Sequence, residues 1–217
     1  MKNKRYWDYK YILLDWDGCL AKTLDIWMEG YQETFPLYNL HPSEHEIVEK
    51  CYGKWDGPKS FGIEDVDGFY KKLMLVIESK LEAVLLYSGA KDLFQELKAR
   101  GKKLVILTTS ERRYVQKAIE HHNLTKFVDH LFAGDEVKKH KPDPEPIYKG
   151  LLTVGGNLME SIIVGDSDKD VLAGRNAGID SVLFLPEENK RFYNEAELLS
   201  LKPTYVIDQF DQLLKIV

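Results

Sequence analysis

Two aspartates follow an apolar run near the start of the chain, in the sequence DWDG at 15–18. The preceding residues, KYILL, are typical of a short buried strand that ends at Asp15 or Trp16. Asp15 and Asp17 would then share one face at the carboxyl end of the strand. A second copy, DVDG at 65–68, has no buried strand before it, and we expect it to be a solvated turn.

Three further acids, Asp166, Asp168 and Asp170, follow another apolar run, SIIVG. Alternating acids also occur in EF-hand calcium loops, which need glycine at the sixth position and glutamate at the twelfth. Val171 and Ala177 stand there, so the calcium-loop template does not fit. Capping of the following helix would explain one of the aspartates but not all three.

Hydroxyl groups and a lysine complete the set of candidate residues. The sequence TTS at 108–110 follows the apolar run KKLVIL, although these residues could simply end a strand and cap the next helix. Lys141 precedes the rigid turn Pro-Asp-Pro at 142–144. Lys141 could belong to a solvated charge run with Lys138 and Lys139, but the turn would fix it better than an ordinary surface lysine.

The segments that carry these residues alternate between strand and helix patterns. The segments 11–16, 102–110, 161–168, 181–186 and 204–208 each contain an apolar, strand-like run. Helical patterns fill 90–100, 111–122, 144–152, 169–177 and 208–216. This alternation predicts a doubly wound α/β fold with a mostly parallel sheet, in which ligands bind beyond the carboxyl ends of the strands.

One region, from about residue 20 to residue 86, shows no strand pattern. Helical patterns at 23–35, 42–52 and 69–86 are joined by turns rich in glycine and aspartate. We interpret this region as an all-helical insert after the first strand.

Composition narrows the class of protein. The chain has 217 residues and a formal net charge of -5, with 44% hydrophobic and 30% charged residues. These values are typical of a globular protein and argue against a general nucleic-acid binder. No apolar stretch is long enough for a membrane span or a signal peptide, and two cysteines fit a reducing compartment. We therefore expect a cytoplasmic protein without nucleic-acid or membrane partners. The composition is compatible with a monomer and with a homodimer.

At successive strand ends, the fold would bring together the carboxylates of Asp15, Asp17, Asp166 and Asp170. Four anions at one point repel one another strongly, so such a site is expected around a hard cation. Ligation by oxygen alone, with few protein carboxylates, suits Mg²⁺. Thr108 and Lys141 would add a hydroxyl donor and a fixed positive charge, which together indicate phosphoryl transfer.

With these motifs in place, the chain resembles the haloacid dehalogenase-like hydrolases, in the branch of phosphoglycolate phosphatase and β-phosphoglucomutase. The resemblance covers nearly the whole chain and rests on four motifs: DWDGC at 15–19, Thr108 after VIL, Lys141 before proline, and GDSxxD at 165–170. It implies a Rossmann-like core at 1–20 and 87–217 and a helical cap at 21–86. It also implies cap closure, with hinges near 20–22 and 87–89.

The resemblance also implies a role for each matching residue. Asp15 would attack phosphorus to form an aspartyl-phosphate, and Asp17 would protonate the leaving alcohol and then activate water. Thr108 would hydrogen-bond the phosphoryl oxygens, and Lys141 would neutralise charge. Gly18 and the backbone N–H of Thr109 would also contact the substrate.

The implied metal is Mg²⁺. Its ligands would be the carboxylates of Asp15 and Asp166 and the backbone carbonyl of Asp17, with Asp170 holding a metal-bound water or orienting Lys141. Three positions depart from the common family pattern, namely Trp16, Cys19 and Thr109.

Other activities on the same fold stay open. A dehalogenase would not be expected to keep Asp17, because a halide leaving group needs no proton. A phosphomutase uses the same residues but must exclude water from the phospho-enzyme. A non-catalytic binding protein is a third possibility, which the intact motifs disfavour.

The substrate would be a small phosphorylated metabolite, with phosphoglycolate, sugar phosphates, nucleoside monophosphates and pyrophosphate as candidates. In this branch a loop between cap helices sets specificity, and here that loop is expected at 52–57. We hypothesise that Lys54 pairs with an anionic group of the substrate and that Trp55 limits or stacks on it. The alternative for Trp55 is packing inside the cap.

Overall fold

The computed structural model describes residues 8–217, and its centre is a parallel sheet of six strands in the order β3-β2-β1-β4-β5-β6. The strands are β1 (Tyr11–Leu14), β2 (Lys103–Leu107), β3 (His130–Phe132), β4 (Ser161–Gly165), β5 (Asp180–Phe184) and β6 (Tyr205–Ile207). The register pairs Leu13 of β1 with Val105 of β2 and with Ile163 of β4. The β1 strand is therefore central, and its end lies between the ends of β2 and β4.

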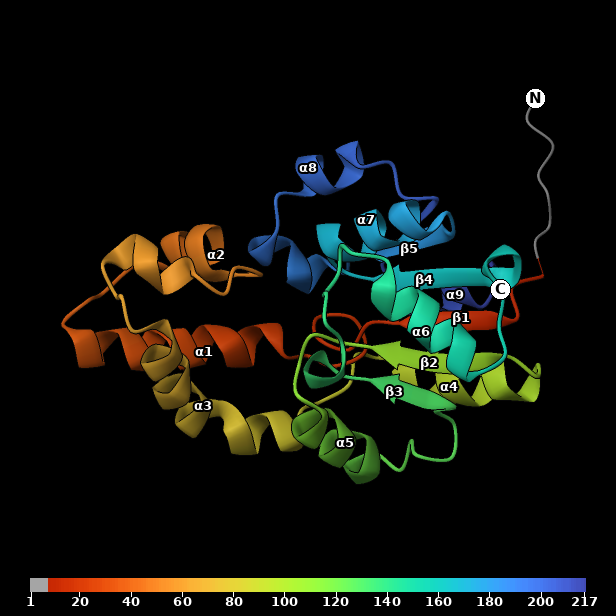
Figure 1. Ribbon diagram of the computed structural model, residues 1–217, viewed down its shortest axis with the longest axis horizontal. Coiled ribbons are helices and arrows are strands. Elements are labelled where there is room, and N and C mark those ends of the chain that lie inside the picture. Colours follow the sequence, from red (N-terminus) through yellow and green to blue (C-terminus); the bar gives the residue numbers. More distant parts are fainter. Residues whose placement is uncertain (1–7) are drawn as a thin grey trace.

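Helices cover both faces of the sheet (Figure 1). One face carries α4 (Ala90–Ala99), α5 (Arg112–His121) and α9 (Phe210–Leu213). The opposite face carries α6 (Glu145–Thr153) and α7 (Asp168–Ala177). The helix α8 (Glu195–Ser200) follows β5 after a short 3-10 helix, Glu187–Phe192.

Alternation along β1 explains why the sheet is covered on both sides. Ile12 and Leu14 are buried in the cluster that includes α4, α5 and α9. Leu13, between them, is buried in the cluster that includes α6 and α7. Because successive strand residues point to opposite faces, a continuous apolar run requires two apolar layers.

Residues between β1 and α4 form a helical unit that lies beside the sheet (Figure 1). Its helices are α1 (Leu24–Thr34), α2 (Glu44–Cys51) and α3 (Val66–Glu82). They share a buried cluster rich in aromatic side chains, including stacked Tyr31 and Phe69 with ring centroids 6.1 Å apart.

Two chain segments connect the helical unit to the sheet, and they run side by side. The N–H of Tyr87 donates to the carbonyl of Leu20 at 3.0 Å, and the N–H of Lys22 donates to that of Leu85 at 2.8 Å. Ala21 also forms a bridge with Leu86.

The predicted fold class is confirmed, including the parallel sheet and the helical insert. Two predictions from the sequence were incomplete, because the short strand β3 and the helix α8 were not foreseen. The copy DVDG at 65–68 was expected to be a solvated turn, and this prediction was wrong. The copy forms the start of α3. The Asp65 carboxylate accepts the N–H of Gly68 at 2.9 Å, which satisfies a donor left free in the first helical turn.

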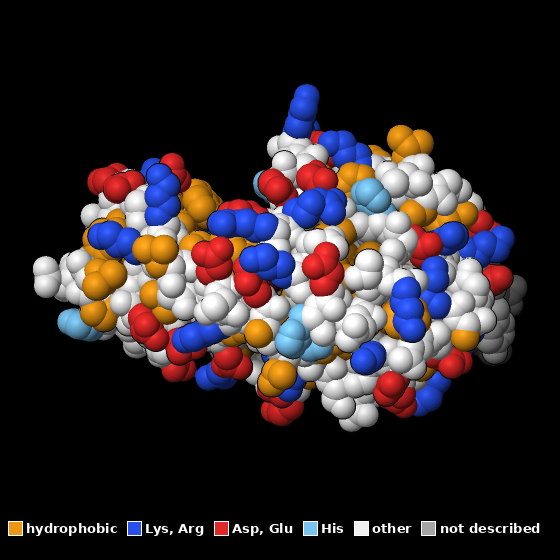
Figure 2. Space-filling model, turned by 90° about the horizontal axis from the view of Figure 1, so that it is seen from below, with side chains coloured by type: hydrophobic (Ala, Val, Ile, Leu, Met, Phe, Trp, Pro, Cys, Tyr) orange, Lys and Arg blue, Asp and Glu red, His pale blue; other side chains and the backbone are white. Residues whose placement is uncertain are grey.

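The helices found between residues 8 and 217 include none with the length and apolar character needed to cross a membrane. Charges of both signs are interspersed over the face shown in Figure 2, with scattered apolar side chains between them.

Candidate active site

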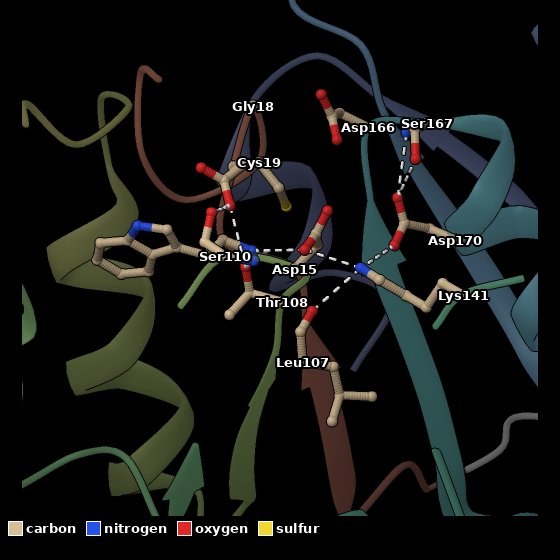
Figure 3. A network of polar contacts seen from close by, with 12 residues as sticks. Asp15, Gly18, Cys19, Leu107, Thr108, Ser110, Lys141, Asp166, Ser167 and Asp170 are labelled. Atoms are coloured by element: carbon tan, nitrogen blue, oxygen red, sulfur yellow. Dashed lines mark hydrogen bonds and ion pairs between the residues drawn. The ribbon is translucent and has the colours of Figure 1, made fainter. Parts of the chain in front are cut away.

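The predicted motif residues meet at the carboxyl edge of the sheet. Asp15 directly follows β1, Thr108 follows β2 and Asp166 follows β4. Parallel strands end at the same edge, so these three side chains come together although they are far apart in sequence. Lys141 reaches the same point from the segment between β3 and α6 (Figure 3).

Lys141 lies at the centre of a buried network. Its ammonium group contacts Asp15 Oδ1 at 2.8 Å, Asp170 Oδ1 at 2.6 Å and the carbonyl of Leu107 at 3.0 Å. Burial alone would lower the pKa of Lys141, but the charges of Asp15 and Asp170 outweigh burial and hold that pKa above its usual range. Lys141 therefore remains a positive charge, held in place by Asp15, Asp170 and the carbonyl of Leu107.

Three buried carboxylates gather beside Lys141. Asp15, Asp166 and Asp170 each offer one oxygen, and these three oxygens lie within 4.8 Å of one another. Burial raises the pKa of Asp15 to about 7, with a further contribution from the charge of Asp170. Burial also raises the pKa of Asp166, with a further contribution from Asp15. One lysine does not balance three acids, so the cluster could hold a hard cation.

The three carboxylates differ in the oxygens that remain available to a cation. Both oxygens of Asp170 are engaged, one by Lys141 and the other by Ser167 in a capping box at the start of α7. Asp15 Oδ1 accepts from Lys141 and from the N–H of Trp16 at 2.8 Å. Its Oδ2 accepts no hydrogen bond from residues 8–217 and is therefore free to react or to bind a cation.

The side chain of Asp17 stands apart from this cluster. Its Oδ2 accepts hydrogen bonds from Thr108 Oγ1 at 2.9 Å and from Ser110 Oγ at 2.8 Å. These hydroxyls do not cap α5, whose N-terminus has no side-chain cap. The structure thus favours a site function for TTS at 108–110 over helix capping. Sequence reasoning did not assign a role to Ser110.

Gly18 allows Asp166 to approach the end of β1. The φ angle of Gly18 is +72°, and a Cβ at this position would lie 1.9 Å from Asp166 Oδ2. Only glycine fits here. The N–H of Gly18 donates to the Ala21 carbonyl at 3.0 Å, so it serves the turn after β1 in this structure. Thr109 is exposed beside Thr108.

The two predicted specificity residues do not join the carboxylate cluster. Lys54 Nζ donates to the carbonyl of Glu49 at 2.7 Å. Trp55 is 63% exposed, so it is not packed inside the helical unit, and its ring stacks on Tyr70 at a centroid distance of 4.1 Å. Their loop nevertheless reaches the helices that cover the sheet, because the carbonyl of Gly53 accepts a hydrogen bond from Lys169 of α7.

One residue that contacts the cluster was missed by the sequence analysis. The hydroxyl of Tyr193, which lies between β5 and α8, donates to Asp166 Oδ2. No motif surrounds Tyr193, and no sequence pattern could have indicated this contact.

Comparisons with known proteins identify the family of this chain. Residues 12–184 match the family model of the haloacid dehalogenase-like hydrolases. The chain is 30% identical over 214 residues to pyrophosphatase PpaX of Bacillus mycoides, covering 95% of each chain. It is 29% identical over 211 residues to PpaX of Halalkalibacterium halodurans, with the same coverage.

Solved structures show the same fold. A predicted phosphoglycolate phosphatase of Haemophilus somnus superposes with a TM-score of 0.82 at 24% identity, covering 96% of this chain and 98% of that one. CbbY of Rhodobacter sphaeroides in complex with phosphate gives a TM-score of 0.77 at 20% identity, covering 94% and 96%. The family model spans most of the chain, and the chain therefore belongs to the haloacid dehalogenase-like hydrolases.

Proposed function

We propose that this protein is a Mg²⁺-dependent phosphatase that hydrolyses a small phosphorylated metabolite through a phosphoryl group carried on Asp15. The observation that carries this proposal is the carboxylate of Asp15, buried at the end of β1 beside Lys141, with one oxygen unengaged by residues 8–217. A carboxylate that is ionised can attack phosphorus without a base.

The donor set of the cluster fits Mg²⁺, since it consists of oxygens and carries excess negative charge. Asp15 and Asp166 would hold the ion through carboxylate oxygens and Asp17 through its backbone carbonyl. Asp170 would contribute through a water molecule while it orients Lys141. When bound, Mg²⁺ offsets the repulsion between the Asp15 carboxylate and the phosphoryl oxygens.

The first chemical step transfers the phosphoryl group to Asp15. A bond forms between an Asp15 oxygen and phosphorus, and the bond from phosphorus to the leaving oxygen breaks. Asp17, held by Thr108 and Ser110, gives its proton to that leaving oxygen. Lys141 and the N–H of Thr109 stabilise the phosphoryl oxygens. Thr108 and Gly18 would join them once the hydroxyl of Thr108 leaves Asp17 and the N–H of Gly18 leaves the Ala21 carbonyl.

The second step returns Asp15 to its starting state. Asp17, now ionised, takes a proton from a water molecule, and the water oxygen bonds to phosphorus. The bond between phosphorus and Asp15 breaks, and inorganic phosphate is released with the carboxylate restored. The same residue thus serves as acid and then as base.

We assign the core to 1–20 and 87–217 and the cap to 21–86, with residues 1–7 lying outside the described part of the chain. A buried cluster formed mostly by cap residues, and the two adjacent connections, support this division. Hinges near 20–22 and 87–89 would let the cap open and close over Asp15. Two free buried cysteines agree with a cytoplasmic location.

Pyrophosphate is a second candidate substrate, because the relatives that cover 95% of this chain are named pyrophosphatases. Phosphate release from phosphoglycolate, sugar phosphates, nucleoside monophosphates and pyrophosphate, with Mg²⁺ or with EDTA, tests the proposal. We expect release from at least one compound with Mg²⁺ only. Release unaffected by EDTA would contradict the metal dependence. Isomerisation of a sugar phosphate without release would indicate a mutase.

The protein without metal should lose stability as the pH rises, and Mg²⁺ should restore it. The raised pKa of Asp15, about 7, means that protonated Asp15 stabilises the fold below pH 4 and that this contribution disappears as the pH approaches 7. Mg²⁺ at 100 times its dissociation constant adds about 2.7 kcal/mol, or roughly 5–10 °C in Tm. We expect this Tm increase at pH 8 and little of it at pH 5.

The matched variants for this thermal measurement are Asp166→Asn and Asp168→Asn. Asp166 belongs to the buried cluster after β4, whereas Asp168, two residues later, is exposed at the start of α7. Asp166→Asn should abolish the Tm increase and Asp168→Asn should retain it. Equal Mg²⁺ effects at both pH values would refute the competition between protons and metal.

Lys54→Ala tests whether the loop at 52–57 contributes to specificity. If Lys54 leaves its contact with Glu49 and pairs with an anionic group of the substrate, KM should rise by about tenfold, the equivalent of 1.4 kcal/mol. Phosphate release with the best substrate of the panel provides the measurement, and Lys59→Ala, a nearby surface change in the cap, is the control. Unchanged rate constants for Lys54→Ala would end this hypothesis.

A further inference from the structure

A short segment between β5 and α8 connects the sheet with the helical unit. This segment, called the connector here, comprises residues 186–193 and contains the 3-10 helix Glu187–Phe192. In Figure 1 it lies between β5 and α2, close to the helical unit. We propose that Tyr193 of the connector is a positioning residue that orients the metal-binding carboxylate of Asp166. This inference rests on the proposed function.

The contact between Tyr193 and Asp166 is direct and has no substitute. The hydroxyl of Tyr193 donates to Asp166 Oδ2, and the carboxylate of Asp166 accepts no other hydrogen bond from residues 8–217. Asp166 is 1% exposed, so water does not replace this donor freely. With Oδ2 held by a hydroxyl, the other oxygen of Asp166 is left for the cation.

The surroundings of Asp166 explain why it needs such a donor. Asp15 and Asp170 lie close by and repel its charge, while Gly18 leaves just enough room for Oδ2. A lysine at the position of the Tyr193 hydroxyl would neutralise the charge that attracts the cation. A neutral hydroxyl fixes the carboxylate and leaves that charge in place.

Contacts on both sides hold the connector in position. In the core, buried Asn189 donates from Nδ2 to the carbonyl of Gly18 at 2.8 Å, and its Oδ1 accepts the hydroxyl of Tyr87. Towards the helical unit, the ring of Phe192 stacks on Tyr52 at a centroid distance of 5.2 Å. The backbone before Tyr193 is therefore anchored, which gives its hydroxyl a fixed place.

Arg191 adds a charged contact between the connector and the helical unit. Its guanidinium pairs with Asp25 of α1 and lies 3.7 Å from a carboxylate oxygen of Glu44 in α2. The segment that carries the Tyr193 hydroxyl is therefore attached to α1, to α2 and to the turn after β1. Asp166 is thus oriented by a residue outside β4 and α7, the two elements that flank it.

Binding of Mn²⁺, followed by calorimetry and by the electron paramagnetic resonance of the free ion, tests this role. Tyr193→Phe removes the hydroxyl and keeps the ring, and it should raise the dissociation constant of Mn²⁺ by about tenfold or more. The control is Tyr9→Phe, which removes a comparable buried contact, the 2.7 Å hydrogen bond from Tyr9 to Asp180, away from the site. Tyr9→Phe should leave Mn²⁺ binding unchanged.

A second variant separates the hydroxyl from the ring. Tyr193→Ala should weaken Mn²⁺ binding about as much as Tyr193→Phe does, because both variants remove the hydroxyl that donates to Asp166. The Mg²⁺ concentration for half-maximal activity should rise in both variants, while kcat at saturating Mg²⁺ changes much less. A purely structural role would lower Tm in these variants without moving the metal affinity.

Different results overturn different claims. A Mn²⁺ affinity of Tyr193→Phe within twofold of the wild type would overturn the role of Tyr193 and leave the proposed function standing. An unchanged affinity for Tyr193→Phe beside a much weaker one for Tyr193→Ala would assign the effect to ring packing and likewise overturn it. A wild-type protein that binds no Mn²⁺ would refute both this inference and the proposed metal dependence.

Discussion

Asp15→Asn is expected to abolish phosphate release, lowering kcat by a factor on the order of 10⁴ or more, as the loss of other covalent nucleophiles does. Asparagine has the shape of aspartate and can still accept the hydrogen bond from Lys141, so the network around Asp15 should persist. It cannot form the acyl-phosphate, because its amide nitrogen replaces the oxygen that attacks phosphorus. Phosphate release from the best substrate of the panel measures the effect.

The second DxDG copy offers a matched control for this variant. Asp65→Asn makes the same substitution in the same tetrapeptide pattern, and asparagine caps a helix as well as aspartate does. Asp65→Asn should therefore keep full activity. Rapid quenching with ³²P-labelled substrate should give protein-bound label in the wild type and none in Asp15→Asn. Label that persists in Asp15→Asn would place the phosphoryl group on another residue.

The sequence could predict the part of the site that depends on strand ends. Asp15 and Asp166 each follow an apolar run, and a parallel sheet brings the ends of such runs to one edge. Lys141 could be predicted because a rigid turn follows it. The second tetrapeptide copy was separated correctly from the first by the absence of a buried strand, although its own conformation was not a turn.

Contacts made by segments without a local pattern could not be predicted. Tyr193 reaches Asp166 from a segment 27 positions later, and only the packing of the connector decides where its hydroxyl lies. Strand β3 has only three residues, of which Leu131 alone is buried, so it is too short for a periodic pattern to be seen. In the sequence, Ser110 has the pattern of an ordinary residue before a helix. Only the structure shows that its hydroxyl donates to Asp17.

Asp17→Asn should slow hydrolysis of alkyl phosphates by 10²- to 10⁴-fold, the usual contribution of a general acid. Asparagine can still accept hydrogen bonds from Thr108 and Ser110, so the side chain should keep its place. It has no carboxyl proton to give to the leaving group. The loss should depend on the leaving group. An alkoxide needs the proton to depart, whereas the nitrophenolate of p-nitrophenyl phosphate departs without it.

That dependence separates a catalytic role of Asp17 from a structural one. With p-nitrophenyl phosphate, Asp17→Asn should release about one equivalent of nitrophenolate per site in a stopped-flow burst, because Asp15 is still phosphorylated. The following turnover should be slow, since the base that activates water is missing. Asp168→Asn, an exposed change, should behave as the wild type does. Equal losses for both classes of substrate, without a burst, would mean that Asp17 only supports the structure. A burst seen only with p-nitrophenyl phosphate would instead show that Asp17 acts as the acid and the base. The hydroxyls of Thr108 and Ser110 would then contribute to catalysis by holding Asp17 in place.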